Sequence, residues 1–111
     1  MRRGDVVVVA LSGDYGKPRP AVVVQSDSVL TPVSVFVCPL TTSVEPSDVL
    51  RIVVAPSEAN GLREPSQLMV DKTSPTRRDR CGPVIGRIDD ATMAELDGRL
   101  AFVLGLADGA P

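Results

Sequence analysis

Short runs of β-branched and aliphatic residues, separated by turn-forming residues, recur along the chain and predict a mainly β fold. Runs of this length, rich in Val and bounded by Gly, Pro, Asn, Asp or Ser, are typical of strands. The predicted strands are Asp5–Leu11, Ala21–Asp27, Val33–Leu40, Arg51–Ala55, Gln67–Asp71 and Val84–Ile88. Short strands at this spacing favour a small, strongly curved sheet or barrel.

The spacing of the apolar residues changes near residue 90, where steps of three and four residues replace the alternation. The residues at this new spacing are Met93, Leu96, Leu100, Val103 and Leu104. This period predicts an amphipathic helix from about Asp90 to Leu106. Asp89 or Asp90 can cap its N-terminus, while Thr92–Glu95 forms a competing capping box, so the first residue of the helix stays open.

The length of 111 residues and the 43% of hydrophobic residues predict one domain, residues 1–111, with a single core. Its core must be aliphatic, because the chain has two Phe, one Tyr and no Trp. No apolar run reaches the length of a membrane span, and Val6–Leu11 is too short for the apolar part of a signal peptide. We therefore expect a soluble, cytoplasmic protein.

The charges are unevenly distributed along the chain. The net charge is −2 and the sequence pI is about 5.0, which argues against a general nucleic-acid coat. Residues 63–87, however, carry six Lys or Arg against three Asp or Glu. This excess is compatible with a local cationic groove. The run Arg77–Arg80, taken alone, is more typical of a solvated loop.

The chain contains no histidine, which excludes the histidine-dependent forms of hydrolysis and histidine metal sites. Cys38 and Cys81 have no CxxC companion and predict neither a zinc site nor a disulfide framework. We therefore expect no cofactor and no metal. Acid–base chemistry is left to Asp, Glu, Lys, Tyr or Cys.

Three polar residues stand at the ends of predicted strands. Arg19, held between Pro18 and Pro20, opens the second strand; Thr41 follows the third; Asp71 ends the fifth. Proline fixes φ and restricts the preceding residue, so the guanidinium of Arg19 is presented from stiff backbone. Each residue alone is compatible with an ordinary turn or strand end. If a curved sheet brings the three together, they place a cation, a hydroxyl and a carboxylate around one pocket.

Several blocks of the chain, in order, resemble the MazF/PemK toxin family. These blocks are Arg3-Gly4-Asp5-Val6, Gly16-Lys17-Pro18-Arg19-Pro20 with the strand to Asp27, Val35–Ser43, Ser66–Lys72 after Gly61-Leu62, and Gly86-Arg87-Ile88-Asp89 before a helix. The resemblance implies a small SH3-like antiparallel β-barrel with a C-terminal α-helix, in a homodimer. It also implies the toxin of a type II toxin–antitoxin pair, a sequence-specific endoribonuclease (mRNA interferase) that needs no metal.

The resemblance places the functional arginine, hydroxyl and acid of the family on Arg19, Thr41 and Asp71. RNA supplies its own nucleophile, the 2′-OH, and the products implied are a 2′,3′-cyclic phosphate and a 5′-OH. Arg19 suits stabilisation of the phosphoryl charge, Thr41 a hydrogen bond to the phosphate, and Asp71 the role of base. A second arginine of some relatives is replaced here by Met69, which leaves the proton donor unassigned.

Single-stranded RNA is expected to lie across the dimer groove, with phosphate contacts to Lys17, Arg77 and Arg78. Tyr15 suits base stacking, and Thr42 belongs to the hydroxyl-rich turn after the third strand. The cognate antitoxin is expected to lay an acidic segment over the same cationic surface.

Two other functions share this type of barrel. A CcdB-like inhibitor of DNA gyrase acts through a C-terminal tryptophan, which this chain lacks. In a non-catalytic SH3-like binding module, Arg19 would only anchor a carboxylate or phosphate.

Overall fold

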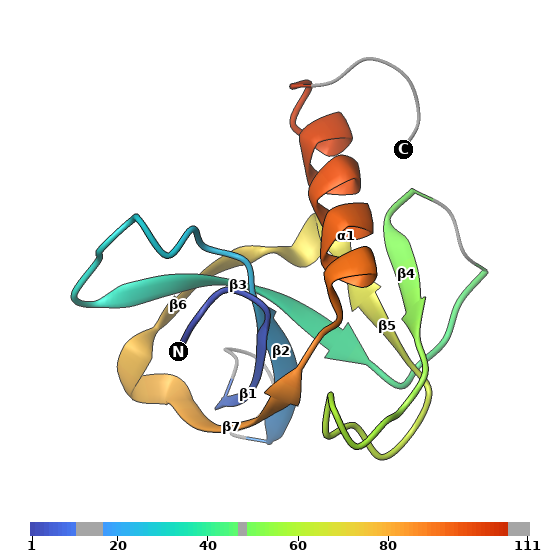
Figure 1. Cartoon of the computed structure of the whole chain (residues 1–111), viewed down its shortest axis with the longest axis horizontal. Coiled ribbons are helices and arrows are strands. Elements are labelled where there is room, and N and C mark those ends of the chain that lie inside the picture. The colour runs from blue at the N-terminus through green and yellow to red at the C-terminus, as the bar shows by residue number, and fades with distance from the viewer. Residues whose placement is uncertain (11–16, 47–48, 107–111) are drawn as a thin grey trace.

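The computed structural model describes residues 1–10, 17–46 and 49–106 of the chain. These residues form strands, short 3₁₀ turns and one C-terminal α-helix, joined by loops (Figure 1). The strands are β1 (Asp5–Ala10), β2 (Pro18–Val23), β3 (Ser34–Thr41), β4 (Arg51–Val54), β5 (Ser66–Met69), β6 (Ser74–Arg77) and β7 (Cys81–Arg87). The helices are the short 3₁₀ turns η1 (Val70–Lys72) and η2 (Arg78–Arg80) and the α-helix α1 (Asp90–Val103). The predicted mainly β fold with a C-terminal helix is confirmed.

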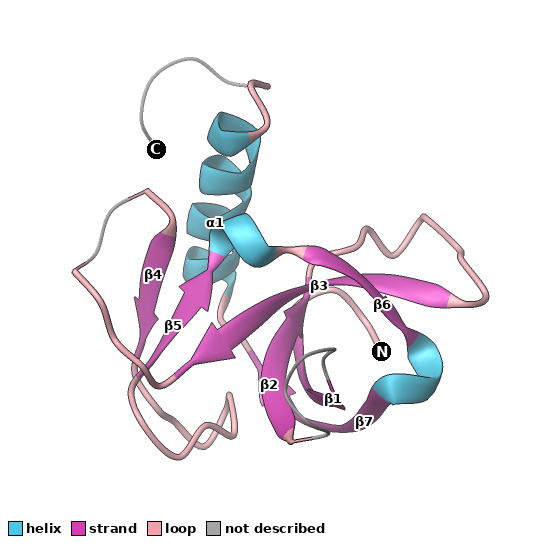
Figure 2. Cartoon of the chain, turned by 180° about the vertical axis from the view of Figure 1, so that it is seen from behind, coloured by secondary structure: helices cyan, strands magenta, loops and turns pink. Residues whose placement is uncertain are grey.

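The described strands form one antiparallel sheet in the order β4-β5-β3-β2-β1-β7, and β6 also pairs with β3 (Figure 2). β3 has β2 on one edge, and along its other edge it pairs first with β6 and then with β5. The end strands β4 and β7 are not paired with each other in this order. A closed barrel would need that last ladder, so the sheet of the described residues is curved but open.

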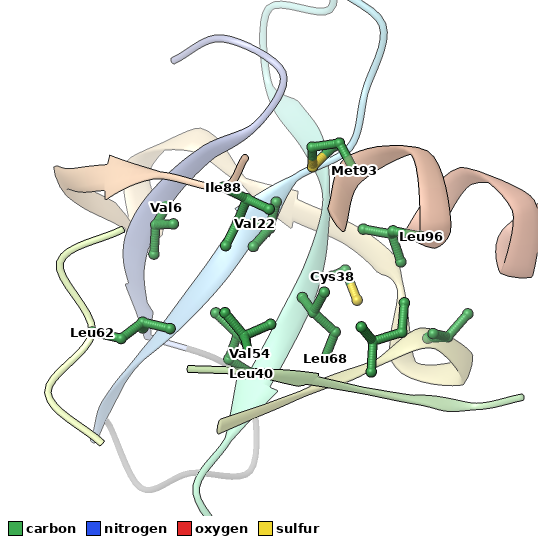
Figure 3. Close-up of a cluster of buried hydrophobic side chains, with 12 residues drawn as sticks. Val6, Val22, Cys38, Leu40, Val54, Leu62, Leu68, Ile88, Met93 and Leu96 are labelled. Atoms are coloured by element: carbon green, nitrogen blue, oxygen red, sulfur yellow. The ribbon is translucent and has the colours of Figure 1, made fainter. Parts of the chain in front are cut away.

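Successive side chains of β2 and β3 point to opposite faces of the sheet, and each face buries its own cluster. The first cluster faces α1, where Met93 and Leu96 of the helix meet Val22, Cys38 and Leu40 of the sheet (Figure 3). The second cluster lies on the other face and consists of small aliphatic residues from three strands. Its members are Val7, Val9, Ala21, Val23, Val35 and Val37.

Two strand boundaries differ from the predicted ones in a way that moves the site residues. β2 begins at Pro18, so Arg19 does not precede the strand but lies inside it, paired with Val9 of β1. Prolines are tolerated there because the ladder with β3 starts only at Ala21, and residues 18–20 have a described strand partner on one side only. β5 ends at Met69, two residues earlier than predicted, and the chain turns directly into η1.

α1 begins at Asp90, as predicted, and ends at Val103, three residues earlier than predicted. The open question of its cap is answered by Asp89, whose carboxylate accepts the N–H of Thr92 at 2.7 Å. This hydrogen bond lowers the pKa of Asp89. No helix in the described ranges is long and apolar enough to cross a membrane.

Candidate active site

A cavity of about 640 Å³ opens beside β2, β3 and the segment from β5 to η2. It is lined by four cations and three hydroxyls, with Ala10, Pro39, Met69 and Pro75 between them. The cations are Arg19, Lys72, Arg77 and Arg80, and the hydroxyls belong to Thr41, Ser74 and Thr76. No carboxylate in the described part of the chain lines it. The cavity is therefore suited to a strongly anionic ligand.

Arg19 and Thr41 enter the cavity from neighbouring strands at matching positions. The antiparallel register between β2 and β3 ends at the pair Ala21 and Pro39, and beyond this pair Arg19 lies two residues before Ala21 and Thr41 two residues after Pro39. Both residues also continue the face of the second cluster, because a two-residue step keeps the side chain on one face. The apolar face thus ends in a cation and a hydroxyl, and the predicted meeting of these two residues in one pocket is confirmed.

Thr41 is almost buried, with 9% of the residue exposed. Its hydroxyl oxygen accepts the backbone N–H of Ser43 at 3.0 Å. A hydroxyl can accept and donate at once, so this contact fixes the oxygen while its own proton stays available to a ligand.

Asp71 does not join Arg19 and Thr41, and the prediction of one pocket for all three is wrong on this point. Asp71 lines a second cavity of about 440 Å³, whose other walls are mostly apolar and include Leu100, Val103 and Leu104. Had β5 continued as a strand, the two-residue period would have put Asp71 on the face of Met69, which lines the first cavity. The strand ends at Met69, however, and η1 turns Asp71 away.

Lys72 takes the place in the first cavity that the sequence assigned to Asp71. In η1 the side chain of Val70 is buried and packs in the cluster facing α1, Asp71 lines the second cavity, and Lys72 lines the first. Sequence reasoning missed Lys72, Ser74, Thr76 and Arg80 as lining residues. The basic excess of residues 63–87 includes Lys72 and Arg80, but it does not show which side chains converge, and no signal in the sequence indicated Ser74 or Thr76.

The predicted substrate-binding residues are placed unequally. Arg77 lines the cavity and forms a two-point ion pair with Asp79, Nη2 to Oδ2 at 2.6 Å and Nε to Oδ1 at 3.1 Å. This pair raises the pKa of Arg77 and lowers that of Asp79. Arg78 does not line the cavity, because its Nε donates to the carbonyl of Thr31 at 2.8 Å. Its side chain fastens the loop before β3.

Three further predicted contacts lie outside this cavity or outside the described residues. Lys17 and Thr42 are exposed and are not among the lining residues. Tyr15 falls in residues 11–16, which the structure does not describe.

Neither cysteine lines the cavity. Burial raises the pKa of Cys38 to about 11. Hydrogen bonds to the thiol lower this pKa in part, and the charge of nearby Asp71 raises it. Cys81 is half-buried, and burial raises its pKa as well. Both thiols are therefore protonated at neutral pH and do not supply a nucleophile here. In the described ranges, no three His, Cys, Asp or Glu residues gather as a metal site would require.

Residues 2–104 match the model of the PemK-like, MazF-like toxin of type II toxin–antitoxin systems. The chain belongs to this toxin family. It is 40% identical over 108 residues to a protein of Mycolicibacterium smegmatis named probable endoribonuclease MazF, covering 96% of this chain and 99% of the relative. The resemblance stated from the sequence motifs is therefore confirmed, and with it the membership in a family of endoribonuclease toxins.

Solved structures of MazF toxins share the fold. Mycobacterium tuberculosis toxin MazF-mt6 superposes with a TM-score of 0.78 at 23% identity, covering 94% of this chain and 99% of that one. A mycobacterial endoribonuclease in complex with its cognate antitoxin gives 0.78 at 22% identity, with 98% and 99% covered. A chain of a MazE–MazF crystal structure from Deinococcus radiodurans gives a TM-score of 0.73 at 19% identity, with 96% of this chain and 97% of that one covered.

Proposed function

We propose that this MazF-family toxin cleaves single-stranded mRNA at the cationic cavity, by attack of a ribose 2′-OH on the adjacent phosphate and without a metal ion. The observation that carries the proposal is that Arg19 and Thr41 line one cavity, together with three further cations and no described carboxylate. An RNA phosphate is the anion in this reaction, and unpaired nucleotides leave the phosphate and the 2′-OH accessible to side chains.

The chemistry asks little covalent work of the protein. RNA brings the nucleophile, and the protein must align it with phosphorus and stabilise the charge that develops on the phosphoryl oxygens. Arg19 can hold two of these oxygens with its planar fork, and Thr41 can donate its proton to one of them. The new O2′–P bond and the broken P–O5′ bond leave a 2′,3′-cyclic phosphate and a 5′-OH.

The role of base that was predicted for Asp71 is not part of this proposal, because Asp71 lines the other cavity. The cations of the first cavity favour the ionised form of the 2′-oxygen electrostatically instead. The proton of the 2′-OH then passes to solvent, which reaches the open cavity.

We propose a cytoplasmic homodimer that holds RNA across the groove between its two copies. Arg77, Lys17 and Thr42 serve as contacts along the strand, and Tyr15 as a stacking residue. Arg78 acts indirectly, because its guanidinium holds the loop before β3. The partner is a cognate antitoxin, as one mycobacterial relative has been solved in complex with its own. An acidic antitoxin segment would compete with RNA for the four cations.

Incubation of the purified protein with a long mixed-sequence RNA in EDTA tests this function. We expect discrete cuts whose fragments carry 5′-OH and 2′,3′-cyclic phosphate ends. Arg19→Ala should slow cutting by about 10³-fold, the usual loss when a preorganised charge-stabilising group is removed. Arg63→Ala is the matched control, because Arg63 is exposed and does not line the cavity. Its cutting should be unchanged.

The absence of cutting by a folded protein would contradict the proposal and favour the gyrase-inhibitor or binding-module alternatives. Cutting that requires a divalent ion would keep the substrate and overturn the mechanism.

A further inference from the structure

Lys72 differs from the other cations of the cavity in chemistry. The guanidinium groups of Arg19, Arg77 and Arg80 hold their protons too tightly to donate them in a reaction. An ammonium group gives up its proton far more readily, and it carries three donors on a flexible stem. Among the cavity's described lining residues, Lys72 is therefore the charged group best able to act as an acid.

The surroundings of Lys72 leave its ammonium group available. Within the described residues it forms no ion pair with a carboxylate, whereas Arg77 is held by Asp79. Its backbone, in contrast, is fixed. Val70 is buried, and its N–H donates to the carbonyl of Leu50 at 2.9 Å. The Oγ1 of Thr73 donates to the carbonyl of Val70 at 2.9 Å and closes the turn. An ammonium group on a flexible four-carbon stem, carried by an anchored turn, can follow a leaving group.

We infer that Lys72 is the general acid of the cleavage, the group that protonates the 5′-oxygen as it leaves. The inference rests on the proposed function. As the O2′–P bond forms and the P–O5′ bond breaks, one proton passes from Lys72 Nζ to O5′. The proton of the 2′-OH passes to solvent water, and the neutral amine takes a proton back from water. No electron acceptor or additional reactant is needed.

Met69, three residues before Lys72, lines the same cavity as an apolar residue and cannot donate a proton. Lys72 reaches this cavity because η1 turns the chain directly after Met69. The segment from β5 to η1 thus supplies its proton donor to the cavity through Lys72.

A change of leaving group separates an acid from a simple phosphate contact. In one RNA the cleavage site carries the ordinary 5′-oxygen, and in the other a sulfur atom replaces that oxygen. A thiolate leaves without protonation, so only the first RNA needs the acid. Lys72→Ala should slow cleavage of the oxygen RNA by about 10²- to 10³-fold, as loss of a general acid does. The same variant should cleave the sulfur RNA at a rate within about threefold of that of the wild type.

Three further variants serve as controls in the same assay. Lys72→Arg keeps the positive charge without a transferable proton, so it should behave like Lys72→Ala with both RNAs. Arg77→Ala removes a phosphate contact only, so it should slow both RNAs by the same factor. Arg63→Ala should cleave both RNAs at the wild-type rate. Because Lys72 is exposed, its variants should fold, which circular dichroism checks.

The inference is overturned if Lys72→Ala cleaves the oxygen RNA normally, if it slows both RNAs equally, or if Lys72→Arg restores cleavage. A wild-type protein that cleaves neither RNA overturns the proposed function itself, and the inference with it. The activity of the wild-type protein therefore distinguishes a failure of the proposed function from a failure of the inference about Lys72.

Discussion

The two faces of β3 show how one strand serves stability on one side and chemistry on the other. Cys38 and Leu40 point into the apolar cluster that α1 covers. Val37, Pro39 and Thr41 point to the opposite face, where the small aliphatic cluster ends in the cationic cavity. The alternation of a strand is enough to separate the two roles. Changes on the helix face should therefore alter folding, and changes on the cavity face should alter rates.

Asp71 and Lys72 make the same contrast at neighbouring positions. One lines a mostly apolar cavity beside α1, the other a cavity lined by cations. Both residues belong to the single 3₁₀ turn η1, and its backbone directs one charge to each cavity.

The largest expected effect on the helix face comes from Leu96→Ala. Leu96 is fully buried against the sheet, so the truncation should lower the free energy of unfolding by about 3 kcal/mol. Urea denaturation measures this loss. At temperatures where the variant remains folded, its cleavage rate should match that of the wild type. A large loss of rate in the folded variant would break the separation of the two faces.

Thr41→Val tests the opposite case on the cavity face. The variant loses the hydrogen-bond donor and should slow cleavage by about 10²-fold, or ~2.7 kcal/mol. Its stability should change little, because the N–H of Ser43 that loses its acceptor lies in an exposed turn. Single-turnover cleavage and urea denaturation together give both numbers. Thr92→Val on α1 is the matched control, and an equal loss of rate there would contradict the assignment.

The buried thiol of Cys38 gives the helix face its own pH dependence. Its pKa is about 11 in the folded protein against about 9 for an ordinary thiol. Between these values the unfolded chain ionises and the folded chain does not, so stability falls as the pH rises from 9 to 11. The fall attributable to this thiol is about 2.7 kcal/mol at most.

The difference between the wild type and Cys38→Ala isolates this fall from other groups that titrate at high pH. Urea denaturation at pH 8, 9, 10 and 11 should show a steeper decline in the wild type, while Cys81→Ala should keep most of it. Parallel declines in wild type and Cys38→Ala would show that Cys38 is not shielded from solvent as the structure has it.

Asp71→Asn is expected to have the smallest effect. Asp71 is exposed and lies on the second cavity, so removal of its charge should change the cleavage rate by no more than about twofold. A loss of cleavage rate comparable to that of Arg19→Ala would show that Asp71 acts as the base. It would contradict the division of roles between the two cavities. Initial cleavage rates at pH 7 decide between the two.

The sequence was sufficient for most of the fold and for Arg19 and Thr41, two of the three residues of the proposed catalytic set. Val-rich runs and the three- and four-residue spacing after residue 90 identify the strands and the helix, because burial on a sheet face or a helix stripe imposes those periods. β6 was missed, since Ser74-Pro75-Thr76-Arg77 has neither an apolar alternation nor a turn signal at its ends. Its pairing with β3 comes from tertiary context.

The same limit explains the error at Asp71. A strand that runs to residue 71 and a strand that ends at Met69 before a 3₁₀ turn differ by one turn of backbone, which no pattern in Gln67–Asp71 distinguishes. The prediction that Arg19 and Thr41 share a cavity was correct because both residues lie within paired strands, where a two-residue period keeps side chains on one face.

Binding of an uncleavable RNA, followed by NMR, tests most directly the claim that the chemistry lies on the cavity face alone. A single-stranded oligonucleotide with 2′-deoxyribose at the cleaved position has no nucleophile and stays intact. We expect the amide signals of Arg19, Thr41, Lys72 and Thr76 to shift on titration, while those of Val29 and Leu104 beside the second cavity stay in place. Shifts centred on the second cavity, with Arg19 and Thr41 unmoved, would contradict the account.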